Sequence, residues 1–263
     1  MDLGLQGKVA VITGGSIGIG LAVGKGLAAE GADVAIIARN AERLEAARAE
    51  IASVGQGRVA VLAADVSTSD GASQVVSFVE QEFGGADILV NNAGSGSNET
   101  IMDADDGKWQ SYWDLHVMAA VRLARGLVPS MRRRGGGVIL NNASICAAQP
   151  LWYEPIYNVT KAALVMLSKT MATEFIKDNI RVNAINPGFV LTPDWIKTAK
   201  QLTADTGGDW QGYIDTLAKE NAPIGRFSSP DEIAAFFVFL CSAKASYSVG
   251  STYFVDGGML KTI

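Results

Sequence analysis

The 263-residue sequence predicts a single α/β domain in which helices cover both faces of a doubly wound parallel sheet. Short apolar runs alternate with helical patterns along the chain, a glycine-rich turn directly follows the first run, and polar motifs follow several later runs. In such a sheet the turns and motifs meet at the carboxyl ends of the strands, where ligands bind.

Seven apolar runs are predicted as strands, because a strand buried on both faces reads as a nearly continuous apolar stretch. They cover residues 8–13, 33–38, 59–64, 87–91, 137–142, 180–186 and 252–255. Helical patterns fill the intervals. The first helix is expected from Ile19 to about Glu30, ending before Gly31.

A glycine turn joins the first predicted strand to the first predicted helix. Gly14, Gly18 and Gly20 have the spacing Gly-x-x-x-Gly-x-Gly. Glycines allow a tight turn and a close approach of the backbone to a pyrophosphate, whose charge is favoured at a helix N-terminus. Plain packing is the alternative, but the position between strand and helix favours a dinucleotide site.

Tyr157 and Lys161 stand four residues apart, and Ser144 lies thirteen residues before the tyrosine. Residues i and i+4 share a helix face, so the phenol and the ammonium can act on one bound molecule. We expect the lysine charge to lower the tyrosine pKa towards a useful range for acid/base chemistry. For the pair alone, chance spacing is the alternative.

Taken together, the motifs resemble those of the short-chain dehydrogenase/reductase family over nearly the whole chain. The matching segments are 13–20, 91–94, the Ser144, Tyr157 and Lys161 set, 186–188 and 256–258. The resemblance implies a Rossmann-type sheet with strand order 3-2-1-4-5-6-7, hydride transfer between a nicotinamide and a carbinol or carbonyl carbon, and a homotetramer. Apolar helix segments at 118–127 and 162–171 are candidate interfaces, although burial in the core would look similar.

The resemblance also implies a role for each matching residue. Tyr157 handles the proton, Lys161 binds the nicotinamide ribose, Ser144 holds the substrate oxygen, Thr192 contacts the carboxamide and Asp65 the adenine. The full expected cofactor site comprises Gly14, Ser16, Ile17, Gly18, Ile19, Gly20, Arg39, Asp65, Val66, Asn92, Ala93, Gly94, Tyr157, Lys161, Pro187, Gly188, Val190 and Thr192.

Arg39 indicates which nicotinamide cofactor is preferred. The second strand ends in Ala38, Arg39 and Asn40, without the acidic residue that binds a ribose 2′-hydroxyl. A guanidinium there can bind a 2′-phosphate, so we predict NADP(H), with NAD(H) as the second choice. Against this, Ser16 stands where many NADP-preferring relatives carry a basic group, and a solvated Arg39 is the alternative.

His116 departs from the family pattern, which usually has an asparagine that holds a helix irregularity and a water. A histidine keeps donor and acceptor capacity but changes charge between pH 5 and 8. We therefore expect either a relay residue that adds a limb to the pH-rate profile or a structural histidine.

The segment 189–226 is predicted to form a substrate lid, because it lies between the sixth strand and the last long helix. It carries Trp195, Trp210 and Tyr213, and Trp152 and Tyr153 are expected at the same mouth. Packing explains these aromatic residues equally well.

We expect the substrate to be a secondary alcohol or ketone. 3-Oxoacyl thioesters, cyclic ketones and sugar alcohols all remain candidates.

Composition excludes several classes of protein. A net charge of −5 argues against a nucleic-acid surface, and no apolar run is long enough for a membrane span. Because the N-terminal residues also lack a signal-peptide pattern, a cytoplasmic location is predicted. Cys146 and Cys241 are too few for a disulfide framework or a zinc site, so no metal is expected. The basic run 132–134 caps a helix or, as an alternative, docks a carrier protein.

The favoured function is thus an NADP(H)-dependent oxidoreductase. The alternative function is a catalytically idle binding protein that senses the cofactor.

Overall fold

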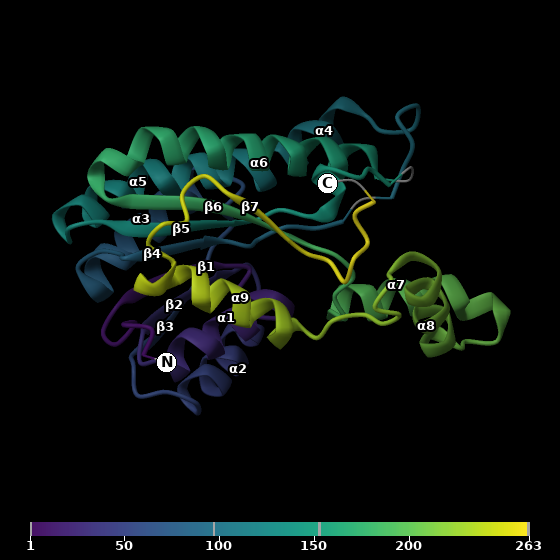
Figure 1. Ribbon diagram of the computed structural model, residues 1–263, viewed down its shortest axis with the longest axis horizontal. Coiled ribbons are helices and arrows are strands. Elements are labelled where there is room, and N and C mark those ends of the chain that lie inside the picture. The colour runs from purple at the N-terminus through teal and green to yellow at the C-terminus, as the bar shows by residue number, and fades with distance from the viewer. Residues whose placement is uncertain (1, 97, 152–153, 262–263) are drawn as a thin grey trace.

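The computed structural model describes residues 2–96, 98–151 and 154–261 and contains a seven-stranded parallel sheet (Figure 1). The strand order is β3-β2-β1-β4-β5-β6-β7, which confirms the predicted order. The strands are β1 Val9–Thr13, β2 Asp33–Ala38, β3 Val59–Ala63, β4 Ile88–Asn91, β5 Gly137–Asn142, β6 Ile180–Pro187 and β7 Thr252–Val255. Each lies within one or two residues of its predicted bounds.

Helices cover both faces of the sheet, as predicted (Figure 1). One face packs against α1 (Gly18–Ala29), α2 (Ala41–Ala52) and α9 (Pro230–Cys241). The other packs against α3 (Ser69–Phe83), α5 (Ala119–Arg133) and α6 (Pro155–Phe175). All five residues of β1 and all eight of β6 are buried, so the central strands have no solvent-facing side.

Three further helices lie at the carboxyl edge of the sheet: α4 (Asp106–Trp113), α7 (Pro193–Thr203) and α8 (Trp210–Asn221). In Figure 1, α7 and α8 project beyond the body of the domain. A one-turn π-helix, Asp114–Met118, separates α4 from α5, and it contains His116. The helix irregularity that the family resemblance implied at this position is therefore present.

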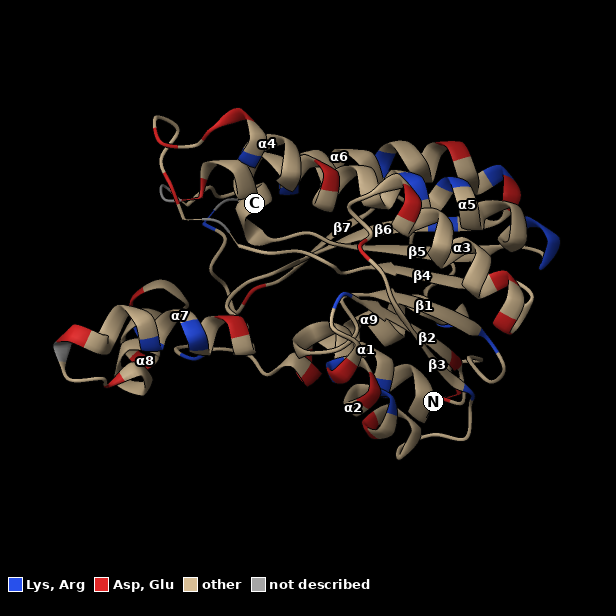
Figure 2. Ribbon diagram, turned by 180° about the vertical axis from the view of Figure 1, so that it is seen from behind, with Lys and Arg blue, Asp and Glu red and all other residues tan. Residues whose placement is uncertain are grey.

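Positions of acidic and basic residues are interspersed along the helices (Figure 2). In the basic run at the end of α5, each arginine pairs with an acidic residue: Arg132 with Asp178, Arg133 with Glu80 and Arg134 with Asp87. These pairs tie the helix end to neighbouring elements, which favours the structural role over a docking site. Within the described residues, no helix combines the length and apolar character needed to cross a membrane.

Candidate active site

The candidate site lies at the carboxyl edge of the sheet, because most of the predicted motifs follow a strand. Asn92 to Gly94 follow β4, Ser144 follows β5, and Gly188 follows β6. A side chain on Gly188 would lie 2.7 Å from the Asp256 carbonyl, so the motifs at 186–188 and 256–258 are in direct contact. Parallel strands thus bring segments that are distant in sequence to one edge.

The glycine turn has the conformation that close approach to a ligand requires. Gly14 and Gly18 have φ of +65° and +58°, a region that favours glycine. A Cβ on Gly20 would lie 2.2 Å from the Gly14 carbonyl oxygen, so no side chain fits there. The turn also leaves Ile17 at the N-cap of α1 with no side-chain hydrogen bond to the helix amides. An uncapped N-terminus behind a glycine turn fits a dinucleotide pyrophosphate.

Other expected cofactor residues lie around this turn. Ser16, Ile17 and Ile19 are partly exposed on it. Thr192 caps α7 and would contact a side chain at Gly18 at 3.4 Å, so it lies against the turn. Val190 is buried in a bridge to Ser228, where it supports this segment rather than facing outward.

Asn92 fixes the glycine turn to β4. Its amide donates to the carbonyls of Thr13 and Gly14 at 3.0 and 3.1 Å, and its Oδ1 accepts from Asn142 at 2.8 Å. The Thr13 hydroxyl accepts from the backbone amides of Asn92 and Ala93, both at 3.0 Å. The side chain of Asn92 is therefore committed to the protein, and its contribution to the site is to hold the turn in shape.

Ser144, Tyr157 and Lys161 converge beside this turn. Lys161 is buried, its Nζ donates to the Asn142 carbonyl at 2.8 Å, and the ammonium lies 5.3 Å from the centre of the Tyr157 ring. Ser144 is buried at the start of a 3₁₀ turn, and its Oγ accepts from the Cys146 amide at 3.2 Å. The spacing predicted from sequence thus corresponds to one spatial group.

Burial sets the protonation of this group. It raises the pKa of Tyr157, against the opposing effect of a hydrogen bond with Ser144, and it lowers the pKa of Lys161 to about 8. The expectation that Lys161 lowers the phenol pKa is therefore wrong for this structure. The ammonium lies over the ring face and donates to a carbonyl, while desolvation disfavours the phenolate.

His116 is buried behind Tyr157, with the two rings edge to face at 5.6 Å. The Ser95 amide donates to Nε2 at 3.3 Å, so the proton belongs on Nδ1, which donates to the Thr160 hydroxyl at 2.8 Å. Thr160 in turn donates to the Ile156 carbonyl at 2.9 Å. This chain of hydrogen bonds requires the neutral imidazole.

Burial, followed by the charge of Lys161, lowers the pKa of His116 to about 2. The prediction that its charge changes between pH 5 and 8 is therefore wrong. A buried imidazole whose hydrogen bonds are satisfied stays neutral, and it acts through position rather than charge.

The adenosine end of the expected site is formed by Arg39 and Asp65. Arg39 is exposed directly after β2, and no hydrogen bond or ion pair to it occurs among the described residues. Burial acts to raise the pKa of Asp65, but hydrogen bonds from Ser67 and the charge of Arg39 lower it overall. Val66 is buried beside it. The exposed guanidinium of Arg39 is therefore available for a phosphate.

The aromatic residues of the expected lid mostly pack against one another. Trp195 contacts Phe189 and Phe227 edge to face at 5.5 and 5.3 Å, and Trp210 and Tyr213 belong to the same cluster. Packing therefore accounts for Trp195. The expected substrate residues Trp152 and Tyr153 lie outside the described residues.

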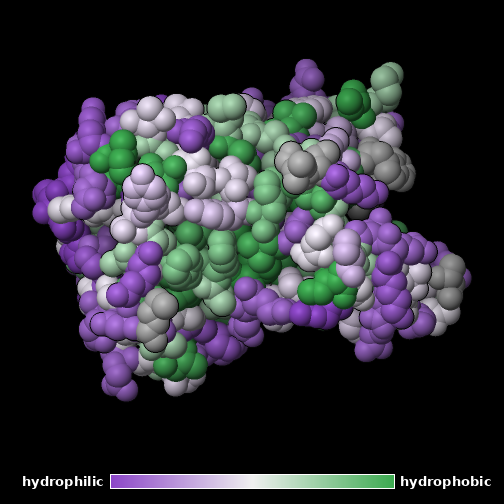
Figure 3. All heavy atoms as spheres, in the orientation of Figure 1, coloured by the Kyte–Doolittle hydropathy of each residue, from purple (hydrophilic) through white to green (hydrophobic). Residues whose placement is uncertain are grey.

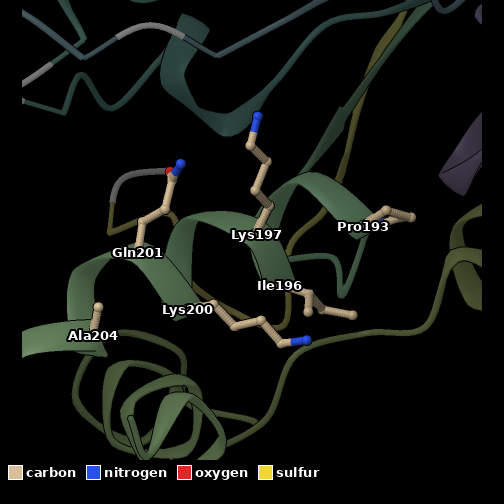
Figure 4. Close-up of a pocket in the computed structure, with 6 residues that line it drawn as sticks. All are labelled: Pro193, Ile196, Lys197, Lys200, Gln201 and Ala204. Carbon is tan, nitrogen blue, oxygen red and sulfur yellow. The ribbon is translucent and has the colours of Figure 1, made fainter. Parts of the chain in front are cut away.

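The opposite face of α7 borders an open groove of about 550 Å³. Figure 4 shows Lys197 and Gln201 pointing from the helix in one direction and Lys200 in another. The remaining lining residues are Pro193, Ile196 and Ala204. The groove therefore belongs to α7, the helix that Thr192 caps next to the glycine turn.

Two acidic residues near the site were missed in the sequence. Glu154 and Glu99 are 55 positions apart, and neither belongs to a family motif. The one available signal was Pro155, which marks a helix start and so places Glu154 at the edge of the turn that carries Tyr157.

Comparison with known proteins agrees with this geometry. A family model described as Enoyl-(Acyl carrier protein) reductase matches residues 14–260, and curated relatives include dehydrogenase/reductase SDR family member 4 of Homo sapiens, 34% identical over 97% of this chain and 88% of the relative. The chain belongs to the short-chain dehydrogenase/reductase family and is an oxidoreductase of that family.

Individual members are also similar over their whole length. A solved structure of L-sorbose reductase from Gluconobacter frateurii, complexed with NADPH and L-sorbose, is 68% identical, covers 100% of both chains and gives a TM-score of 0.99. D-beta-hydroxybutyrate dehydrogenase of Cupriavidus necator is 36% identical over 97% of this chain and 98% of the relative.

Proposed function

We propose that this chain is an NADPH-dependent reductase that converts a ketone to a secondary alcohol, with a sugar ketone as the favoured substrate. The observation that carries the proposal is the convergence of Ser144, Tyr157 and Lys161 beside the glycine turn. The similarity to an L-sorbose reductase complexed with NADPH and L-sorbose supports both the cofactor and the substrate class.

The residues present fit the cofactor. The uncapped start of α1 and the glycines of the turn would hold the pyrophosphate, and Arg39 would bind the 2′-phosphate. Lys161 and Thr192 would hold the nicotinamide half, at the other end of the turn. When bound, this group supplies the hydride for the reduction.

Each member of the catalytic group has a distinct role in the proposed reaction. Ser144 donates a hydrogen bond to the carbonyl oxygen and holds it where negative charge develops. Tyr157 gives its proton to that oxygen as the alkoxide forms, and its raised pKa keeps the phenol protonated for this step. His116 positions Tyr157 through the edge-to-face contact and holds Thr160 on the same helix.

The segment 189–226 is proposed as the lid over this site, because Thr192, the N-cap of α7, lies against the glycine turn and α7 borders a groove. Trp195 then stabilises the lid rather than contacting substrate. The enzyme is expected to act in the cytoplasm, as the sequence predicted.

The homotetramer that the family resemblance implies is proposed here, and the exposed apolar faces indicate where its interfaces lie. In Figure 3 hydrophobic surface gathers around α9 and β7, where Phe239 and Phe254 are 39% and 38% exposed. On α6 Met166 is 67% exposed and suits the predicted interface at 162–171, whereas Leu123 and Leu127 of the 118–127 segment are buried in the core. Interfaces on α6 and around α9 are therefore the ones proposed.

The test is a panel of ketones and ketoses assayed with NADPH, comparing wild type with Tyr157→Phe. We expect wild-type turnover and a loss of about 100-fold or more in Tyr157→Phe, because that variant keeps the ring and removes the proton. NADPH binding, followed by fluorescence, serves as the control for an intact cofactor site. A Tyr157→Phe variant with full rate contradicts the acid role, and a wild type that binds NADPH without turnover favours the idle cofactor sensor.

A further inference from the structure

We propose that Glu154, backed by the carboxylate of Glu99, is the residue that recognises hydroxyl groups of the substrate and so selects polyhydroxy ketones over plain ketones. The inference rests on the proposed function, since it assigns the substrate class of that same site. It concerns two residues that lie outside the motifs of the family.

Glu154 lies at the catalytic group. It directly precedes the first residue of α6, three positions before Tyr157, and its charge acts on the pKa of both Tyr157 and Cys146. Its Oε1 would lie 3.4 Å from a Cβ on Gly96, so the carboxyl group stands between α6 and the loop after β4. A substrate whose carbonyl reaches Ser144 and Tyr157 has its neighbouring carbons near this position.

The Glu154 carboxyl group is available for a ligand. Although the residue is at the N-cap of α6, its side chain makes no capping hydrogen bond. In the described part of the chain, only backbone atoms of Glu154 make hydrogen bonds, to Leu151 and Asn158. Capping residues usually satisfy helix amides, so a carboxyl group that turns away from them is free for another purpose.

Glu99 provides a second, independent observation that points to a ligand. Its side chain is only 6% exposed and is held by an ion pair with Lys108 and by the Asn98 amide at 3.2 Å, both on Oε2. Its Oε1 is buried with no hydrogen-bond partner among the described residues. A buried acceptor without a donor costs free energy, so we expect this oxygen to accept a hydrogen bond from a hydroxyl group or a protonated carboxyl group.

The charge of Glu99 acts on the Glu154 carboxyl group. Burial, followed by the charge of Glu99, raises the pKa of Glu154 to about 7. Near neutral pH Glu154 therefore exists in both protonation states and can donate or accept a hydrogen bond. Substrate hydroxyls also donate and accept, whereas a plain ketone would leave these buried groups unpaired, which is how a polar site rejects an analogue that lacks a hydroxyl.

The experiment measures kcat/KM for L-sorbose and for cyclohexanone with saturating NADPH in wild type, Glu154→Leu and Glu154→Gln. We expect the L-sorbose to cyclohexanone ratio to fall about 10- to 100-fold in Glu154→Leu, as for loss of a hydrogen bond to a charged group. Glu154→Gln keeps a donor and an acceptor and should fall less. Where cyclohexanone turns over too slowly to measure, the readout is the KM for L-sorbose, raised in Glu154→Leu and partly rescued in Glu154→Gln.

The outcomes separate this inference from the proposed function. An unchanged ratio, with equal loss on both substrates, overturns the inference and leaves Glu154 without a role in substrate choice. A wild type that reduces neither compound contradicts the proposed function instead. Thermal melting and NADPH binding of both variants show whether a lower rate reflects a folded enzyme.

Discussion

His116 should make the protein less stable in mild acid, and His116→Asn should remove that effect. The folded chain holds the imidazole neutral, with a pKa of about 2 compared with an ordinary value of 6.5. Asparagine keeps a donor and an acceptor but does not titrate. The substitution therefore removes one ionisation while leaving the rest of the catalytic group in place.

The sign and size of the effect follow from these two values. Below pH 6.5 the unfolded chain takes up a proton that folded His116 refuses, so the stabilisation is fully present above pH 6.5 and is lost as the pH falls. Between pH 8 and pH 5 the loss amounts to about 2 kcal/mol. Other groups, including Lys161 and Glu154, titrate in both proteins, and their contributions cancel in the comparison.

The assay is urea unfolding of untagged wild type and His116→Asn at pH 8, 7, 6 and 5. The free energy of unfolding of wild type should fall by about 2 kcal/mol more than that of the variant. Because His116 is the chain's single histidine, imidazole NMR gives an independent reading: one signal from the Nδ1–H form, constant from pH 5 to 8. Parallel stability curves, or an NMR midpoint between pH 5 and 8, would refute the neutral histidine.

Three further predictions concern the cofactor site. Lys161 keeps its charge below its pKa of about 8, so kcat/KM under limiting NADPH should fall as the pH rises above about 8 in an initial-rate series from pH 6 to 10; a flat profile speaks against an essential ammonium. Arg39→Ala should lower the NADPH to NADH ratio of kcat/KM about 10- to 100-fold, whereas an unchanged ratio means that Arg39 is only a solvated surface residue. Gly20→Ala forces a methyl group to 2.2 Å from the Gly14 carbonyl and should cost about 1 to 3 kcal/mol in stability and weaken NADPH binding, measured by melting and fluorescence. Gly107→Ala is the control, because its nearest neighbour at 3.0 Å is the end of the Asp105 side chain, and equal effects in the two variants would contradict the steric argument.

The sequence predicted the sheet well because a doubly covered strand has a strong local signature. In β1 every residue from Val9 to Thr13 is buried, and such a run has few other uses. The order of the strands has no such local signature. The alternation of strands and helices predicts a parallel sheet, but the strand order was taken from the family resemblance. The orientation of α7 and α8 depends on contacts such as those of Trp195 with Phe189 and Phe227, which no periodicity specifies.

The site was predicted in its positions but not in its electrostatics. Helical spacing brings Tyr157 and Lys161 to one face, and the structure confirms that closeness. Spacing says nothing about burial, and burial raises the phenol pKa and holds His116 neutral. Glu99 and Glu154 were missed for a related reason, since a pair of acids brought together by tertiary structure has no local pattern.

The pKa shifts of the catalytic group determine which proton step of the proposed reaction the site is ready for. Reduction requires a protonated phenol, whereas oxidation requires a phenolate. Burial raises the pKa of Tyr157 and lowers that of Lys161, so the ammonium that would stabilise a phenolate is itself lost above about pH 8. There is thus little of the pH range in which the Tyr157 phenolate and the charged Lys161 ammonium are present together. A site with this balance keeps the phenol protonated near neutrality, the state in which it can give a proton to a forming alkoxide.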